Sequence, residues 1–295
     1  DSQLSVSSGY TALYVQTGNV RNRGVELSLG YEHQWGIFGW NSNYTFSTNH
    51  NEVLELMENY THPETGNVIS LDQLKVGGFA NAAFVLTPGG TLGDLYTTVD
   101  LNRDEFGNVY VDKDGNISRN AEIGYRKLGS VFSKANMAWN NDFNVGNLNF
   151  GFLISARLGG IVYSATQARL DNFGVSEASA LARDNGGVMV DGYSIDPYKW
   201  YSVVGADSGI PQYYTYDATN IRLQEAHIGY TIPRKKLGGL MDITLSLVGR
   251  NLWMIYCKAP FDPESIATAG NYYQGIDSFM MPSTRNVGFS LRLKF

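Results

Sequence analysis

The sequence has little of what catalysis, metal binding or nucleic-acid binding requires. One cysteine, Cys257, and four histidines are spread over 295 residues, which excludes an internal disulfide and zinc-type ligand spacing. The net charge of -6 offers no basic patch for a phosphate backbone. Neither a Gly-x-Ser-x-Gly motif nor a glycine-rich phosphate loop is present. We therefore expect no enzymatic activity, no cofactor and no nucleic-acid partner.

Long apolar runs are also missing, because no stretch approaches the roughly 18 residues that a membrane-spanning helix needs. The chain starts at Asp1 without a charged and then apolar leader, which fits a mature or truncated product. Aromatic residues, by contrast, make up 13% of the chain, with 19 tyrosines and 33 glycines. This composition is typical of a β-rich protein, so any membrane-spanning part must consist of strands.

Several segments alternate apolar and polar residues with the period of two that places them on opposite faces of a strand. In the final segment Val287, Phe289 and Leu291 alternate with polar or small residues up to Phe295. The other alternating segments are 25–35, 40–47, 148–158 and 242–247. Such strands fit a wall with lipid on one side and water on the other. The alternative is a soluble sandwich or barrel whose apolar face packs inward.

The alternation changes phase once, within the segment 219–232. Ile221 and Leu223 share one parity, whereas Ala226 and Ile228 share the other. A β-bulge near Gln224 and Glu225 would reconcile the two halves. Pro233 then ends the strand, because proline has no N–H to donate.

Short and long connections alternate along the chain, as they do in outer-membrane barrels with tight periplasmic turns and long extracellular loops. This parity leaves the C-terminus in the periplasm. Trp35, Trp40, Phe143 and Phe295 then lie at the periplasmic end, as in an interfacial aromatic girdle. We expect about eight antiparallel strands, at 10–17, 21–35, 40–49, 130–144, 147–159, 213–232, 240–257 and 282–295.

Three groups of residues are candidates for a site. Asp112, Asp114 and Asn116 alternate like calcium ligands, but Gly115 comes too early for an EF-hand, and an Asp-Gly turn explains them better, so no metal is expected. Candidates to line the lumen are Arg157, Arg222, Glu225 and Arg250. Aromatic candidates for contact with a substrate or partner are Tyr193, Tyr198, Trp200, Tyr201, Tyr213 and Tyr214. For these aromatics, substrate contact, partner contact and ordinary loop packing stay open.

Specific motifs resemble the SusC/RagA branch of the TonB-dependent outer-membrane transporters. They are NVRNRGVELSLGY (19–31), GVSEASALARDNGG (174–187), DATNIRLQEAHIGYTIP (217–233), VGRNLW (248–253), KAPFDPE (258–264), GNYYQGID (270–277) and PSTRNVGFSLRLKF (282–295). The resemblance implies that the fold is all-β and that residues 1–295 form the C-terminal portion of a larger barrel of the plugged, 22-stranded type. The plug domain and the earlier strands have no counterpart in this sequence.

The resemblance also implies a function and partners. A transporter of this branch, in the outer membrane of a Gram-negative cell, imports an oligosaccharide or peptide with energy from the TonB complex, which it contacts through its plug. It works with a SusD-like surface lipoprotein. Whether two such pairs form a dimer stays open. Two alternatives remain: a small self-closing barrel with a structural or adhesive role, and a passive porin.

Overall fold

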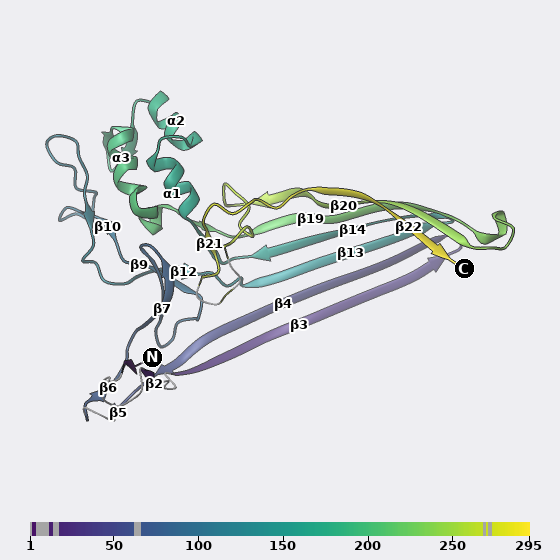
Figure 1. The fold of residues 1–295 in the computed structure, drawn as a ribbon, viewed down its shortest axis with the longest axis horizontal. Helices are drawn as coiled ribbons and strands as arrows, with labels where there is room; N and C mark the ends of the chain where they lie inside the picture. Colours follow the sequence, from purple (N-terminus) through teal and green to yellow (C-terminus); the bar gives the residue numbers. More distant parts are fainter. Residues whose placement is uncertain (1, 4–11, 14–17, 62–65, 268–269, 271–272) are drawn as a thin grey trace.

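The computed structural model describes residues 2–3, 12–13, 18–61, 66–267, 270 and 273–295. An antiparallel sheet of seven strands dominates it, in the order β22-β20-β19-β14-β13-β4-β3 (Figure 1). The strands are β3 (Gly18–Trp35), β4 (Phe38–Leu56), β13 (Ala135–Val145), β14 (Leu148–Leu158), β19 (Asn220–Ile232), β20 (Asp242–Cys257) and β22 (Asn286–Lys294). Within the described residues, β3 and β22 are the two edges of this sheet.

Tight turns join neighbouring strands at one end of the sheet. Gly36 and Ile37 connect β3 to β4, and Gly146 and Asn147 connect β13 to β14. Both glycines have positive φ, +59° and +60°, the backbone conformation that two-residue hairpin turns need and that glycine adopts at least cost. The C-terminus lies at this same end (Figure 1). The predicted alternation of short and long connections is thus confirmed for these strands.

The predicted bulge is confirmed at Gln224. On β14, Leu153 pairs with Glu225 and the next residue, Ile154, pairs with Leu223, so Gln224 has no partner in the ladder. Its side chain donates to Oδ1 of Asn251 at 3.0 Å. The extra residue shifts the later part of β19 by one position and so keeps its apolar residues on one face.

Several strand boundaries differ from the predicted ones. The predicted strand 10–17 falls outside the described residues, except for β2 (Ala12–Leu13), which pairs with β1 (Ser2–Gln3). The range 40–49 was too short, because β4 continues to Leu56 alongside β3. Three strands begin later than predicted: β19 at Asn220 and not at 213, β13 at Ala135 and not at 130, and β22 at Asn286 and not at 282. At the first of these, β18 (Thr215–Asp217) pairs with β15 (Ile161–Ser164) instead of entering the large sheet.

The long connections were predicted as loops, but they contain regular structure. A four-stranded sheet consists of β7 (Leu74–Phe79), β8 (Ala82–Leu86), β9 (Asp94–Thr97) and β12 (Arg126–Ser130). The helices are α1 (Ala165–Asn172), α2 (Glu177–Asp184) and α3 (Pro197–Val204). Shorter strands are β5 (Tyr60–Thr61), β6 (Val68–Ile69), β10 (Asp100–Leu101), β11 (Arg119–Asn120), β16 (Val188–Val190), β17 (Tyr193–Ile195) and β21 (Ile276–Asp277). Short 3-10 turns are η2 (Ala206–Ser208), η3 (Pro211–Tyr213) and η4 (Arg234–Lys236).

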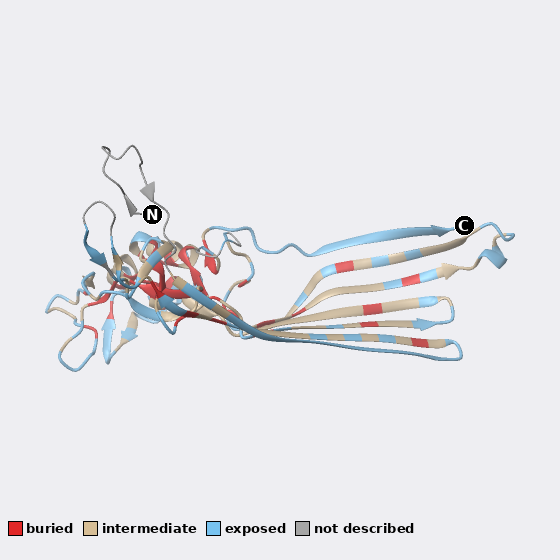
Figure 2. Cartoon of the chain, turned by 90° about the horizontal axis from the view of Figure 1, so that it is seen from below, coloured by how far each residue is buried: buried red, intermediate tan, exposed pale blue. Residues whose placement is uncertain are grey.

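These connections pack together into one body, which we call the loop cap: the described residues of 57–134, 159–219 and 258–285. Its hydrophobic core includes Phe84, Tyr163, Trp200 and Ile276, so all three segments contribute to it. Buried residues concentrate in the cap, whereas the strands of the large sheet are mostly half-buried or exposed (Figure 2). In the described part of the chain, no helix has the length and apolar character needed to cross a bilayer.

Candidate functional site

The large sheet has one apolar and one polar face. Directly paired residues of antiparallel strands point to the same side, so the pairing register defines rows of side chains. One row on the apolar face is Leu29, Tyr44, Trp139, Ile154, Leu223 and Trp253. The next row, displaced by one residue along each strand, lies on the polar face and consists of Ser28, Thr45, Ala138, Ser155, Arg222 and Met254. The predicted period-two alternation therefore extends across the whole sheet.

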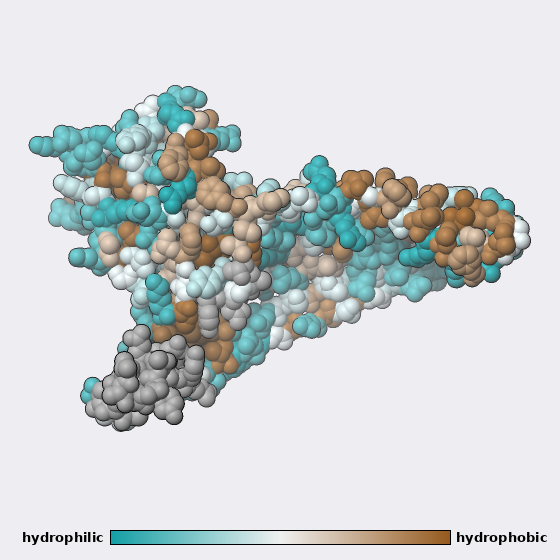
Figure 3. Space-filling view, viewed as in Figure 1, coloured by the Kyte–Doolittle hydropathy of each residue, from teal (hydrophilic) through white to brown (hydrophobic). Residues whose placement is uncertain are grey.

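The apolar face is exposed along its length, with Leu29 56% and Phe289 88% accessible. Hydrophobic side chains gather at the end of the sheet far from the loop cap (Figure 3). Near this end the rings of Trp40 and Phe143 stack with centroids 6.2 Å apart, and Trp35 stacks on Phe38 at 5.7 Å. An exposed apolar face with a band of aromatic residues near one end of its strands is typical of contact with a bilayer.

Asn141 and Ser42 are polar residues on the apolar face, and each accepts a hydrogen bond from a tryptophan. Trp40 Nε1 donates to Asn141 Oδ1, and Trp139 Nε1 donates to Ser42 Oγ, both at 3.0 Å. Asn141 is buried beneath its neighbours. These bonds satisfy indole N–H groups that lipid could not satisfy.

All four candidates for lining the lumen lie on the polar face. Glu225 pairs with Arg250 across β19 and β20, and Arg250 Nε donates to Glu225 Oε2 at 2.9 Å. Arg157 pairs with Asn220 and donates from Nη2 to the carbonyl oxygen of Val131 at 2.8 Å. Arg250 therefore forms an ion pair within the large sheet, whereas Arg157 forms a hydrogen bond with the loop cap.

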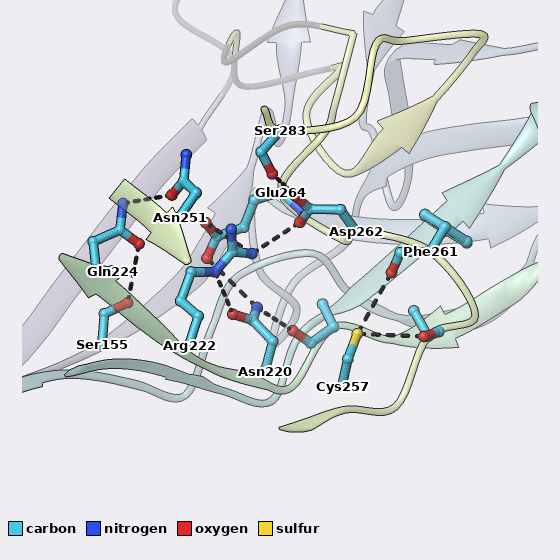
Figure 4. Close-up of polar contacts among 12 residues, drawn as sticks. Ser155, Asn220, Arg222, Gln224, Asn251, Cys257, Phe261, Asp262, Glu264 and Ser283 are labelled. Carbon is cyan, nitrogen blue, oxygen red and sulfur yellow. Dashed lines mark hydrogen bonds and ion pairs between the residues drawn. The ribbon is translucent and has the colours of Figure 1, made fainter. Parts of the chain in front are cut away.

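Arg222 is the centre of a polar cluster where the large sheet meets the loop cap (Figure 4). It is 5% exposed, and its Nη2 lies 2.8 Å from Asp262 Oδ1 and 3.2 Å from Glu264 Oε2. Its Nε donates to Asn220 Oδ1 at 3.2 Å, and Ser283 Oγ donates to Asp262. We call Asn220, Arg222, Asp262, Glu264 and Ser283 the Arg222 cluster. It fastens segment 258–285 of the loop cap to the start of β19.

A pocket lined by both polar and apolar residues lies where the large sheet meets the loop cap, with a volume of about 640 Å³. Its lining includes Asn49, Asn51, Lys134, Gln212, Tyr216 and Asp217. Asn51 donates from Nδ2 to Asn22 Oδ1 at 2.9 Å and accepts from the Leu92 N–H at 2.7 Å. This size and this supply of amides and hydroxyls suit a polar ligand of several heavy atoms, so we call it the mouth pocket.

A stable negative charge lies at the mouth pocket. Partial burial opposes ionisation of Asp217, but hydrogen bonds from Lys258 and Thr219 outweigh it and lower the pKa of Asp217 to about 2. The Lys258 Nζ lies 2.8 Å from Asp217 Oδ2. Asp217 is therefore ionised at neutral pH and joins the start of segment 258–285 to β18.

The six aromatic candidates separate by burial. Trp200 and Tyr214 are 6% and 2% exposed and belong to the core of the loop cap, where the rings of Trp200 and Tyr213 meet edge to face at 5.5 Å. Tyr201 is half-buried on α3, and Tyr213 packs against the core. Tyr193 and Tyr198 are 55% and 78% exposed. For ligand or partner contact, Tyr193 and Tyr198 are thus the most accessible of the six.

Residues 112–116 form a turn, as predicted. The Asp112 carboxylate accepts from the Asp114 N–H at 2.9 Å and from the Asn116 N–H at 2.8 Å, and Gly115 has a φ of +75°. Residues 104–108 repeat this geometry around Asp104. In the part of the chain that the structure describes, no group of acidic, histidine or cysteine side chains is placed to hold a metal ion.

Sequence reasoning missed most of the polar partners. Asn220, Asp262, Glu264 and Ser283 meet Arg222 only because segment 258–285 folds back over β19. One signal was available, since Arg222 and Asp262 both fall in the motifs DATNIRLQEAHIGYTIP and KAPFDPE. The mouth pocket had no such signal, because its lining comes from five separate segments.

Comparison with known proteins gives a consistent result. No family model matches the chain. The chain is 23% identical over 329 aligned residues to the TonB-dependent receptor P39 of Formosa agariphila, covering 98% of this chain and 32% of that protein. Among solved structures, it resembles the RagAB peptide importer in the closed-closed state and the open-open state, each with a TM-score of 0.64. The identities are 16% and 15%, over 99% and 100% of this chain and 31% of the matched chain.

The chain thus spans about one third of the length of the proteins that it matches. The likeness covers the whole of this chain, including the loop cap, and agrees with the motifs quoted above. The chain therefore has the fold of a segment of a SusC/RagA-like TonB-dependent transporter barrel, and its sequence is similar to a TonB-dependent receptor over nearly its whole length.

Proposed function

We propose that this chain is the C-terminal portion of the barrel of an outer-membrane importer that takes up an oligosaccharide or a peptide with energy from TonB. The observation that carries the proposal is a sheet with an exposed apolar face and a polar face that ends at the mouth pocket beneath the loop cap. The apolar face contacts outer-membrane lipid, the polar face lines the path, and the C-terminus lies in the periplasm.

The edges of the sheet support a larger barrel. Strands β3 and β22 are opposite edges of the described sheet. An edge in hydrocarbon leaves backbone N–H and C=O groups unpaired at a cost of several kcal/mol each. We therefore propose that further strands pair with both edges, and the resemblance adds a plug domain through which the TonB complex acts. This argues against the small self-closing barrel.

A partner lipoprotein of the SusD type would sit over the loop cap. One relative by structure is described as the RagAB peptide importer, which supports peptide as the cargo. The exposed Tyr193 and Tyr198 on the cap supply contact area for such a partner or for cargo. The polar-face residues Arg157, Arg222, Glu225 and Arg250 would line the path of the cargo on the inner side of the barrel.

Uptake of labelled peptides and oligosaccharides by cells tests the proposal. We expect uptake of one of these classes to require this protein, to stop when TonB is deleted, and to fall when the gene for the SusD-like lipoprotein is removed. Uptake that persists without TonB would show a passive porin instead. Cells that lose adhesion but no uptake would favour the structural alternative.

A further inference from the structure

A second pocket lies inside the loop cap, between α1, α2 and α3, and has a volume of about 480 Å³. Its polar lining consists of Gln167, Asp171, Glu177, Tyr201, Tyr213, Tyr214 and Tyr216. Two carboxylates face it, and no lysine, arginine or histidine lines it. The pocket therefore presents negative charge without a counter-ion.

Asp171 is the centre of this charge. It is 5% exposed and lies in the last turn of α1, where the helix dipole disfavours an anion. Gln167 Nε2 donates a hydrogen bond to its carboxylate at 2.8 Å, the Tyr214 hydroxyl lies close enough to interact with it, and among the described residues it forms no ion pair. A buried carboxylate without a cation is costly, so a bound cation would stabilise it strongly.

Tyr201, Tyr214 and Tyr216 line the same pocket as this carboxylate. Burial first, and then the charge of Asp171, raise the pKa of Tyr201, Tyr214 and Tyr216, the last to about 12. Tyr214 is 2% exposed, and its Oη is buried with no hydrogen-bond partner within the described chain. A buried hydroxyl without a partner is rare in folded proteins and points to a ligand that the pocket is built to hold.

We propose that this pocket binds a primary ammonium group, the N-terminus or a lysine side chain of a peptide. Asp171 is its counter-ion, Tyr214 Oη accepts one of its three N–H bonds, and the rings of Tyr201 and Tyr216 offer cation–π contact. Glu177 at the rim adds negative potential. The proposal rests on the proposed function, because the pocket would select, among imported peptides, those that carry a free amine.

Titration calorimetry on the full-length transporter in detergent tests the site. The probes are trialanine amide, which carries one ammonium group, and its N-acetylated form. We expect the free amine to bind at least about tenfold more tightly than the acetylated peptide, because a charge-assisted hydrogen bond contributes a factor of about this size to the affinity. Asp171→Asn should remove this preference. Asp184→Asn, the same change at an exposed position of α2, should keep it.

A second variant guards against misfolding. Tyr214→Phe keeps the ring and the carboxylate, and it should reduce the preference by about threefold to tenfold. Equal binding of the two peptides to the wild type, or an unchanged preference in Tyr214→Phe, would overturn the site. Uptake assays separate the two proposals. TonB-dependent uptake without an amine preference would reject the site alone, whereas an amine preference with TonB-independent uptake would reject import alone.

Discussion

The guanidinium of Arg222 on β19 lies 2.8 Å from the carboxylate of Asp262, which belongs to the loop cap. Arg222 is 5% exposed, and Glu264 and Asn220 complete its partners. A buried ion pair between wall and cap fixes where segment 258–285 sits, since leaving either charge alone would be costly. The position of the cap over the mouth thus depends on this contact.

Removal of Arg222 should loosen the cap. Arg222→Ala leaves Asp262 and Glu264 without their cation, and we expect a loss of about 3 kcal/mol, because these partners can partly regain water. Limited proteolysis of the full-length protein should then cleave segment 258–285 much faster. Arg285→Ala is the matched control, since Arg285 is exposed and forms no ion pair in the described chain. Equal cleavage of both variants would show that the cluster does not hold the cap.

The link between Asp217 and Lys258 should fail in acid. The pKa of Asp217 falls from 3.8 to about 2 on folding, so its contribution is present above pH 4 and is lost as the pH falls towards 2. Hydrogen exchange at 215–219 should therefore rise between pH 4 and 2 in the wild type, after correction for the intrinsic rate. In Asp217→Asn it should already be high at pH 5. A pH response that survives in this variant would contradict the assignment.

The turn between β13 and β14 should require glycine. Gly146 has a φ of +60°, and a branched side chain there costs roughly 1–2 kcal/mol. Gly146→Val should lower the urea midpoint of the full-length barrel in liposomes. Gly30→Ala is the control, because Gly30 lies in β3 and a methyl group there meets nothing within 4 Å. Equal effects of the two changes would refute the turn geometry.

The bond between Trp40 and Asn141 should be detectable as coupling. Trp40→Phe and Asn141→Ala each remove one partner, and we expect each to cost about 1 kcal/mol. In a double-mutant cycle measured by urea unfolding, their effects should be non-additive by about 0.6 kcal/mol, the usual size for hydrogen bonds between membrane-embedded side chains. Strict additivity would mean that the bond contributes nothing.

Local pattern was enough to predict the wall but not the cap. Alternation between Val25 and Trp35 depends only on the strand itself, and the change of parity around Gln224 located the bulge. The cap escaped prediction because its core joins residues far apart, such as Phe84 and Ile276. The Arg222 cluster and the grouping of tyrosines around the pocket of Asp171 escaped for the same reason, since these residues meet only after the cap has folded.

The most direct test is the orientation of the two faces in the membrane. Single cysteines at positions 243–248 of β20, placed in a Cys257→Ser background of the full-length protein, can be spin-labelled and their access to oxygen and to a water-soluble nickel complex measured. The account predicts that oxygen access peaks at Ile243, Leu245 and Leu247, and that nickel access peaks at Thr244, Ser246 and Val248. A reversed phase, or no period of two, would contradict it.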